Sequence, residues 1–188
     1  MLRLEPPGGR RRPANEAVFL TWRLHGTLPF LAKHAESRIP EAAFFALDKA
    51  LDTAASGPKW LEESAVAQSV IIALRFGERQ LNLYNLLAFC VMPNHVHIVM
   101  QPMADLPRIN HTIRELAARN ANQIRRRNGT AFWQDGSYDR WVTGCAETRR
   151  IMEYTESDPV AAGLTRTAED WPWSSASHAL NAQSLLAL

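Results

Sequence analysis

Two histidines separated by one residue lie in the run CVMPNHVHIVM at residues 90–100. Side chains alternate along a strand, so His95 and His97 should face the same side, about 7 Å apart along it. Two neutral imidazoles so placed can bind one divalent ion, with a further ligand supplied by another part of the fold. The alternative is a strand that carries two histidines by chance, and the short pattern alone leaves both interpretations open.

A tyrosine and an aspartate nearer the C-terminus are candidates for a nucleophile and a third ligand. Residues 146–158 predict a helix, with Pro159 marking its end. Tyr154 and Asp158 are four residues apart and therefore share a helical face. Brought to the two histidines, this face would place a phenol next to a metal ligand. Tyr154 could equally be a half-buried packing residue, so the spacing alone does not assign its role.

The order of several motifs resembles that of one known family. The segment MPNHVHIV (92–99) is similar to the histidine–hydrophobe–histidine signature of the HUH nucleases. The segments FWQ (132–134), YD (138–139), 154–164 and WPWSS (171–175) follow in the order of the single-tyrosine transposases. The resemblance spans roughly residues 17 to 178 and is greatest to the REP-associated tyrosine transposases.

This resemblance implies a role for each matching residue. His95 and His97 correspond to the family's metal ligands, Tyr154 to its catalytic tyrosine, and Asp158 to an amide residue that completes the metal site in relatives. The implied cofactor is Mg²⁺ or Mn²⁺, and a carboxylate at 158 should preserve or tighten its binding. Arg140 stands where many relatives carry histidine. It could bind phosphate, but a guanidinium cannot accept a proton.

The implied function is that of a metal-dependent single-stranded DNA endonuclease and transposase. Tyr154 would attack a phosphodiester, forming a 5′-phosphotyrosine link at hairpin-associated, REP-like sequences and leaving a 3′-hydroxyl for rejoining. Two alternatives remain: a domesticated protein that binds DNA hairpins without cutting them, and a metal-dependent phosphoesterase acting on a small nucleotide. The branch resemblance favours a monomer over a dimer.

Basic and aromatic residues supply candidate contacts to single-stranded DNA. Arginines bind phosphates, and aromatic rings can stack on unpaired bases. The alternative interpretations are solvated faces for the arginines and core packing for the aromatics. The candidates are Arg10, Arg11, Arg12, Arg114, Arg119, Asn122, Arg126, Trp133, Gln134, Tyr138, Arg140 and Arg149.

Composition is typical of a single cytoplasmic domain. The 188 residues are 46% hydrophobic and carry a net charge of +2. We expect a basic, flexible arm over residues 1–14, one domain over 15–180 and a tail over 181–188. Two cysteines form no disulfide framework, which suits a reducing compartment. No segment has the character of a signal peptide or a membrane span.

The expected elements fit an α+β fold. We predict strands over 17–24, 80–92 and 95–101, an extended segment over 132–142, and a loop over 26–40. Helices are predicted over 41–55, 62–76, 106–127 and 146–158. This order indicates an antiparallel sheet with helices packed on one face. The family resemblance implies its ferredoxin-like version, the HUH nuclease fold.

Overall fold

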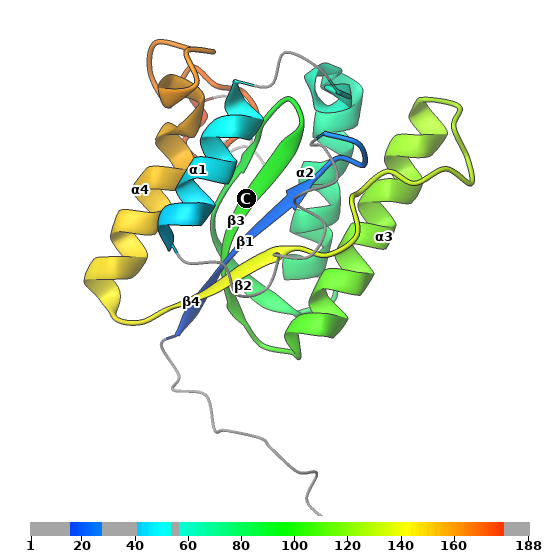
Figure 1. The fold of residues 1–188 in the computed structure, drawn as a ribbon. Helices are drawn as coiled ribbons and strands as arrows, with labels where there is room; N and C mark the ends of the chain where they lie inside the picture. Colours follow the sequence, from blue (N-terminus) through cyan, green and yellow to red (C-terminus); the bar gives the residue numbers. More distant parts are fainter. Residues whose placement is uncertain (1–15, 28–40, 54–56, 179–188) are drawn as a thin grey trace, which may run out of the picture.

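Four strands form one antiparallel sheet in the computed structural model of the chain, which describes residues 16–27, 41–53 and 57–178 (Figure 1). The elements in chain order are β1 (Ala17–Arg23), α1 (Glu41–Asp52), the 3₁₀ turn η2 (Trp60–Glu62), α2 (Ser64–Arg79), β2 (Tyr84–Val91), β3 (His95–Pro102), α3 (Leu106–Ile124), β4 (Tyr138–Val142) and α4 (Cys145–Ala161). The sheet order is β2-β3-β1-β4. The predicted α+β class, with a ferredoxin-like antiparallel sheet, is confirmed.

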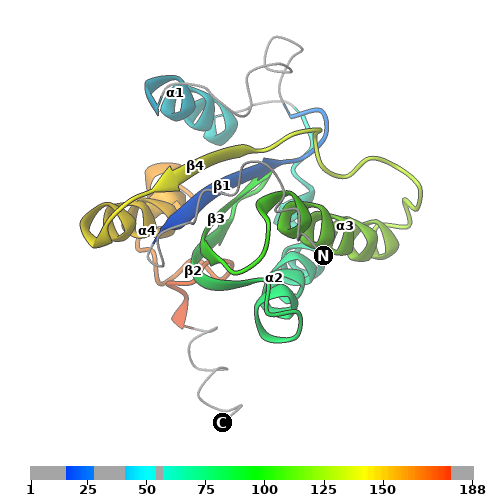
Figure 2. The ribbon, with the colours of Figure 1, turned by 90° about the horizontal axis from the view of Figure 1, so that it is seen from below.

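Helices cover both faces of this sheet, not the single face expected from the sequence (Figure 2). Helices α2 and α3 pack against one face, where Val18, Leu20 and Trp22 of β1 point. Helices α1 and α4 lie against the other, on the side of Phe19 and Val99. All seven residues of β1 are buried. A strand that is apolar on both sides needs cover on both, which is the physical reason for the second helical layer.

The free edge of β2 is paired with the segment that follows α4. The backbone N–H of Val91 donates to the carbonyl of Trp173 at 2.8 Å, and that of Ser175 donates to Phe89 at 2.9 Å. The Ser175 hydroxyl also donates to the carboxylate of Glu156 on α4 at 2.7 Å. The WPWSS motif therefore covers a sheet edge that would otherwise be unpaired and fastens α4 beside it.

Helix α4 continues past the proline that was expected to end it. Pro159 lies inside the helix, and the last turn ends at Gly163, whose φ is +71°. The N–H of Leu164 donates to the Pro159 carbonyl at 2.8 Å, and the N–H of Gly163 donates to Val160 at 3.0 Å. These two hydrogen bonds form a Schellman cap, so the helix ends at the glycine. The proline only removes one hydrogen bond inside the helix. Asp158 thereby stays on the helical face of Tyr154.

Other boundaries differ from the predictions by a few residues. Helix α2 runs to Arg79 and α3 stops at Ile124, while only 138–142 of the expected extended segment forms a strand. Most of the expected loop over 26–40, the arm over 1–14 and the tail over 181–188 lie outside the described residues, and the division into arm, domain and tail stays a prediction. Within the described ranges, every helix is too short or too polar to cross a bilayer.

A buried glycine sets how closely α2 approaches the sheet, and Gly77→Ala should destabilise the protein. An added Cβ would lie 2.5 Å from the Tyr84 hydroxyl and would also meet Cδ1 of Ile113. That hydroxyl donates to the Leu74 carbonyl at 2.7 Å, so it cannot shift without losing its hydrogen bond. We expect urea denaturation to show a loss of about 1–3 kcal/mol in the free energy of unfolding. Ile72→Ala, at a site 54% exposed on the same helix, is the control, and an equal loss there would contradict the argument.

Candidate active site

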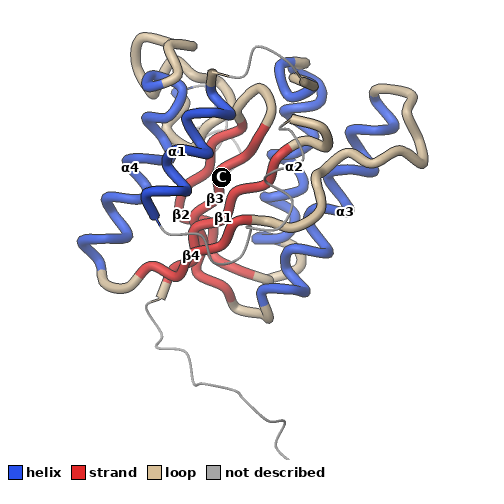
Figure 3. The backbone as a smooth tube through the Cα atoms, viewed as in Figure 1, coloured by secondary structure: helices blue, strands red, loops and turns tan. Residues whose placement is uncertain are grey.

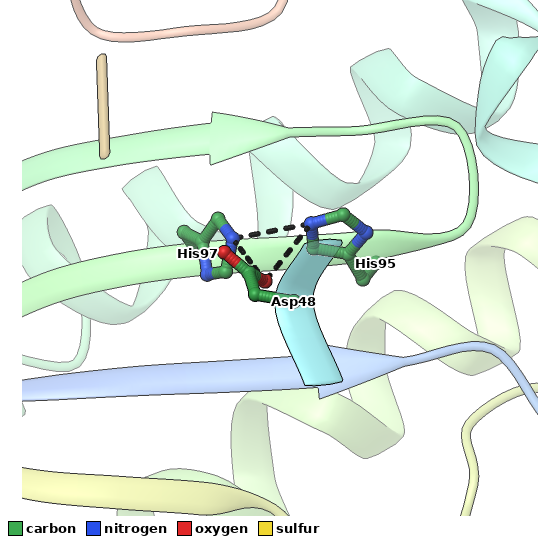
Figure 4. A group of neighbouring side chains, drawn as sticks. All are labelled: Asp48, His95 and His97. Carbon is green, nitrogen blue, oxygen red and sulfur yellow. Dashed lines mark hydrogen bonds and ion pairs between the residues drawn. The ribbon is translucent and has the colours of Figure 1, made fainter. Parts of the chain in front are cut away.

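Strand β3 places His95 and His97 on the face covered by α1 and α4. Both side chains are fully buried, and their Nε2 atoms are 3.1 Å apart (Figure 4). The alternation predicted from the sequence is therefore observed, and both imidazoles turn the same nitrogen toward one point. Figure 3 shows α1 in front of the strands and α4 at their left side.

Hydrogen bonds behind the two rings fix their orientation. His95 Nδ1 is 2.7 Å from Asn94 Oδ1, and the Asn94 amide nitrogen donates to the Leu51 carbonyl at 2.8 Å. Because Asn94 Oδ1 can only accept, His95 Nδ1 carries the proton and its Nε2 presents a lone pair to the site. His97 Nδ1 is 2.9 Å from the hydroxyl of Thr21, its register partner on β1. The rings are therefore oriented as metal ligands are.

Helix α4 brings the predicted tyrosine and aspartate to the histidines. Asp158 is 2% exposed, and its Oδ2 lies 3.4 Å from His97 Nε2 and 3.6 Å from His95 Nε2. The ring centroid of Tyr154 is 6.1 Å from that of His97. The four residues named from the sequence thus lie together in one place, as the four-residue spacing on a helix requires.

Two further carboxylates come from α1 and were missed in the sequence. The Tyr154 hydroxyl donates to Asp48 Oδ2, while Asp48 Oδ1 lies 3.1 Å from His97 Nε2. Asp52 Oδ1 is 3.9 Å from His95 Nε2. Their spacing in the helix EAAFFALDKALD could have indicated them. Asp48 is four residues from both Phe44 and Asp52, so the two aspartates share a helical face with a phenylalanine that is buried.

Charges in this cluster shift one another's pKa values. Burial acts to raise the pKa of Asp48 and Asp158, but attraction to the two histidines holds both below their ordinary values. Burial acts to lower the pKa of His97, yet the two carboxylates raise it to about 10. Burial and then Asp158 raise the pKa of Asp52 to about 6. Burial and then Asp48 raise the pKa of Tyr154 above its ordinary value, so the phenol holds its proton at neutral pH.

The donor atoms fit a divalent metal ion. Asp48 Oδ1, Asp52 Oδ1 and Asp158 Oδ2 are buried and have no hydrogen-bond partner. Within the part of the chain that the structure describes, two ligand groups are close enough to hold an ion, Asp48 with both histidines, and Asp52 with His95 and Asp158. Imidazole nitrogens and carboxylate oxygens are ligands that first-row divalent metals take readily. A cation here would compensate the buried negative charge.

Three of the candidate DNA contacts are exposed arginines. Arg119 lies on α3, Arg126 just beyond its end, and Arg149 in the first turns of α4. Arg119 is 3.6 Å from Glu115, an exposed pair that contributes little to stability. All three side chains are available to a phosphate. Arg10, Arg11 and Arg12 lie outside the described residues.

Four other candidates are buried and participate in the fold. Asn122 donates to the Thr130 carbonyl at 2.8 Å, and Trp133 Nε1 donates to the Arg114 carbonyl at 3.1 Å. The ring of Tyr138 stacks on Phe44 with centroids 4.1 Å apart. The buried residues are Asn122, Trp133, Gln134 and Tyr138, which are 6–8% exposed. Their DNA contacts stay predictions, and any base stacking there would require local rearrangement.

The last two candidates are arginines engaged with the protein itself. Arg114 donates to the Gln134 carbonyl, which links α3 to the segment before β4. Arg140 forms an ion pair with Glu147 in the first turn of α4. Arg140 therefore helps to hold the helix that carries Tyr154, and its contact with DNA stays a prediction.

Comparison with known proteins supports the geometric grouping. Residues 72–158 match a sequence model described as "Transposase IS200 like". This segment contains both histidines, Tyr154 and Asp158, but not α1. No curated protein matches the chain. Among solved structures, a REP-associated tyrosine transposase bound to a REP hairpin is similar, with a TM-score of 0.51 and 14% identity over 90% of this chain and 82% of that chain. At that identity the likeness shows a shared fold.

Proposed function

Residues 72–158 match the IS200-like transposase model, and on this similarity we propose that the chain is a transposase of that kind, which cleaves and rejoins single-stranded DNA. The Tyr154 oxygen attacks a phosphodiester, a bond forms between this oxygen and phosphorus, and the bond to the 3′-oxygen breaks. The phenolic proton leaves the nucleophile, and the released 3′-oxygen gains a proton as a hydroxyl. The observation that carries the proposal is the position of the Tyr154 hydroxyl at the edge of the buried cluster of His95, His97 and Asp158.

The chain's own residues hold and orient the reacting groups. His95, His97 and Asp158 would bind Mg²⁺ or Mn²⁺, which when bound supplies positive charge for the scissile phosphate. Asn94 and Thr21 fix the two imidazoles from behind. Tyr154 is half-buried beside these residues, and the phosphotyrosine link conserves the bond energy needed for rejoining. No nucleotide cofactor is needed.

The proposed substrate is single-stranded DNA that carries a hairpin. The similar solved structure is of a transposase bound to a REP hairpin, which supports this class of ligand. Arg119, Arg126 and Arg149 are exposed and could contact its phosphates. A reaction on chromosomal DNA would take place in the cytoplasm, the location expected from the sequence.

We propose that the active form is a monomer. Tyr154 and both histidines belong to the same chain and lie together without a second copy. A dimer that exchanges its catalytic helices would instead bring Tyr154 of one copy to the histidines of another. Size-exclusion chromatography with light scattering, with and without hairpin DNA, distinguishes the two arrangements.

A labelled hairpin oligonucleotide with a single-stranded flank tests the function. Incubation with Mn²⁺ should yield a protein–DNA adduct that survives denaturing electrophoresis, together with a free 3′-hydroxyl fragment. DNA binding without an adduct would indicate the domesticated binding protein. Neither binding nor adduct, with hydrolysis of a small phosphodiester, would indicate the phosphoesterase.

The carboxylate at 158, a position where the family resemblance implies an amide, gives a graded prediction. Asp158→Asn keeps an oxygen ligand and should retain cleavage, with metal affinity weaker by about tenfold because one negative charge is lost. Asp158→Ala should lose considerably more, because no ligand atom remains. Titration of cleavage with Mn²⁺ compares the three proteins. Wild-type behaviour of Asp158→Ala at limiting Mn²⁺ would remove Asp158 from the metal site.

A further inference from the structure

Asp48 divides its two oxygens between the nucleophile and the histidines. Its side chain is 1% exposed, and it comes from α1, outside the family-matched segment 72–158. Oδ2 accepts the hydrogen bond of the Tyr154 hydroxyl. Oδ1 has no hydrogen-bond partner and lies 3.1 Å from His97 Nε2 and 3.7 Å from His95 Nε2. A divalent ion bound here would compensate the charge of this buried carboxylate oxygen.

Five distances, which join the two imidazole nitrogens to each other and to one oxygen of Asp48 and of Asp158, are compatible with the edges of a single coordination shell. His95 Nε2 and His97 Nε2 are 3.1 Å apart. Asp158 Oδ2 lies 3.4 and 3.6 Å from them, and Asp48 Oδ1 lies 3.1 and 3.7 Å from them. Ligands bound at about 2.1 Å are separated by roughly 3.0 Å in an octahedron and 3.4 Å in a tetrahedron. Asp52 Oδ1, at 3.9 Å from His95, is farther out.

We propose that Asp48 is a fourth protein ligand of the divalent ion, giving a two-histidine, two-aspartate centre in which one carboxylate contacts both the ion and the Tyr154 hydroxyl. This inference rests on the proposed function, because it takes His95, His97 and Asp158 as the other ligands. Two imidazoles with two carboxylates favour Mn²⁺ and other first-row transition ions over Mg²⁺, which prefers oxygen and retains its waters.

A shared carboxylate couples the position of the nucleophile to the metal. The Tyr154 oxygen is one hydrogen bond from Oδ2, and the ion would be one bond from Oδ1 of the same side chain. Displacement of α1 would therefore remove a ligand and release the tyrosine together. In a centre of His95, His97 and Asp158 alone, movement of α1 would leave the ion in place.

Isothermal titration with Mn²⁺, in the absence of DNA, tests the inference directly. Asp48→Asn should weaken Mn²⁺ binding by at least about tenfold, and Asp48→Ala by more. Asp52→Asn is the comparison, since it removes a charge four residues along α1 from a carboxylate outside the proposed shell, and it should weaken binding clearly less than Asp48→Asn. Tyr154→Phe should also remain within about threefold of wild type, because it leaves both oxygens of Asp48 in place. Circular dichroism and thermal unfolding verify that each variant is folded.

The outcomes separate this inference from the proposed function. Loss of Mn²⁺ binding in His97→Ala, with Asp48→Asn and Asp48→Ala as tight as wild type, would overturn the role of Asp48 alone. Equal weakening by Asp48→Asn and Asp52→Asn would show a general charge effect and would also overturn it. Absence of Mn²⁺ binding to the wild-type protein would overturn both the ligand set and the metal requirement. Electron paramagnetic resonance of bound Mn²⁺, altered by Asp48→Asn but not by Asp52→Asn, would support direct coordination.

Discussion

Tyr154→Phe is expected to form no covalent adduct with single-stranded DNA, while binding hairpin DNA nearly as tightly as wild type. The substitution keeps the ring, which packs 6.3 Å from Phe19 and 5.2 Å from Phe45 between centroids, and removes only the nucleophilic oxygen. Without that oxygen no phosphotyrosine can form, so we expect adduct formation to fall by at least roughly a thousandfold. Denaturing electrophoresis of labelled DNA measures adduct, and a gel-shift assay measures binding.

The other tyrosines provide the controls for this experiment. The chain has three tyrosines. The Tyr84 hydroxyl donates to the Leu74 carbonyl in the core under α2, and Tyr138 stacks on Phe44. Tyr138→Phe should therefore still form the adduct. Adduct that persists in Tyr154→Phe and disappears in Tyr138→Phe would transfer the nucleophile to residue 138.

Local periodicity was sufficient to predict the parts of the site that lie on single elements. Alternation along residues 95–97 predicted that both imidazoles lie on one face of a strand. The four-residue spacing predicted that Tyr154 and Asp158 share one face of a helix. Both arrangements depend only on strand and helix geometry, and both are observed. The ordered motifs predicted the family, and the match of residues 72–158 to the IS200-like transposase model supports that prediction. The ligand and nucleophile roles of these residues stay predictions.

Tertiary contacts decided what local periodicity could not. Asp48 reaches the histidines only because α1 crosses the sheet on the same side as α4, and no local rule determines which face a helix covers. Trp133 and Tyr138 had two interpretations in the sequence, base stacking or core, and their burial follows from partners distant in the chain. Pro159 was expected to end α4, but the packing of α4 against β2 and β3 and the cap at Gly163 carry the helix three residues further.

His97→Ala should remove metal-dependent cleavage, and chelation by EDTA should do the same to the wild-type protein. His97 Nε2 lies 3.1 Å from Asp48 Oδ1 and 3.4 Å from Asp158 Oδ2, so its loss removes a ligand and takes this partner from two buried carboxylates. We expect cleavage with Mg²⁺ or Mn²⁺ to fall by at least about a hundredfold. His95→Ala should behave similarly, because His95 belongs to both candidate ligand groups, the one with Asp48 and the one with Asp52.

The same substitution distinguishes a metal ligand from a structural histidine. Loss of the Thr21 hydrogen bond and of the ion pairs should destabilise the metal-free protein, by roughly 1–3 kcal/mol. Mn²⁺ should raise the unfolding temperature of wild type but not of His97→Ala, because only a folded site binds the ion. His111→Ala, at an exposed histidine on α3, should retain both cleavage and the Mn²⁺ shift. Full cleavage by wild type in excess EDTA would leave His97 a purely structural role, as the ion-pair partner of Asp48 and Asp158.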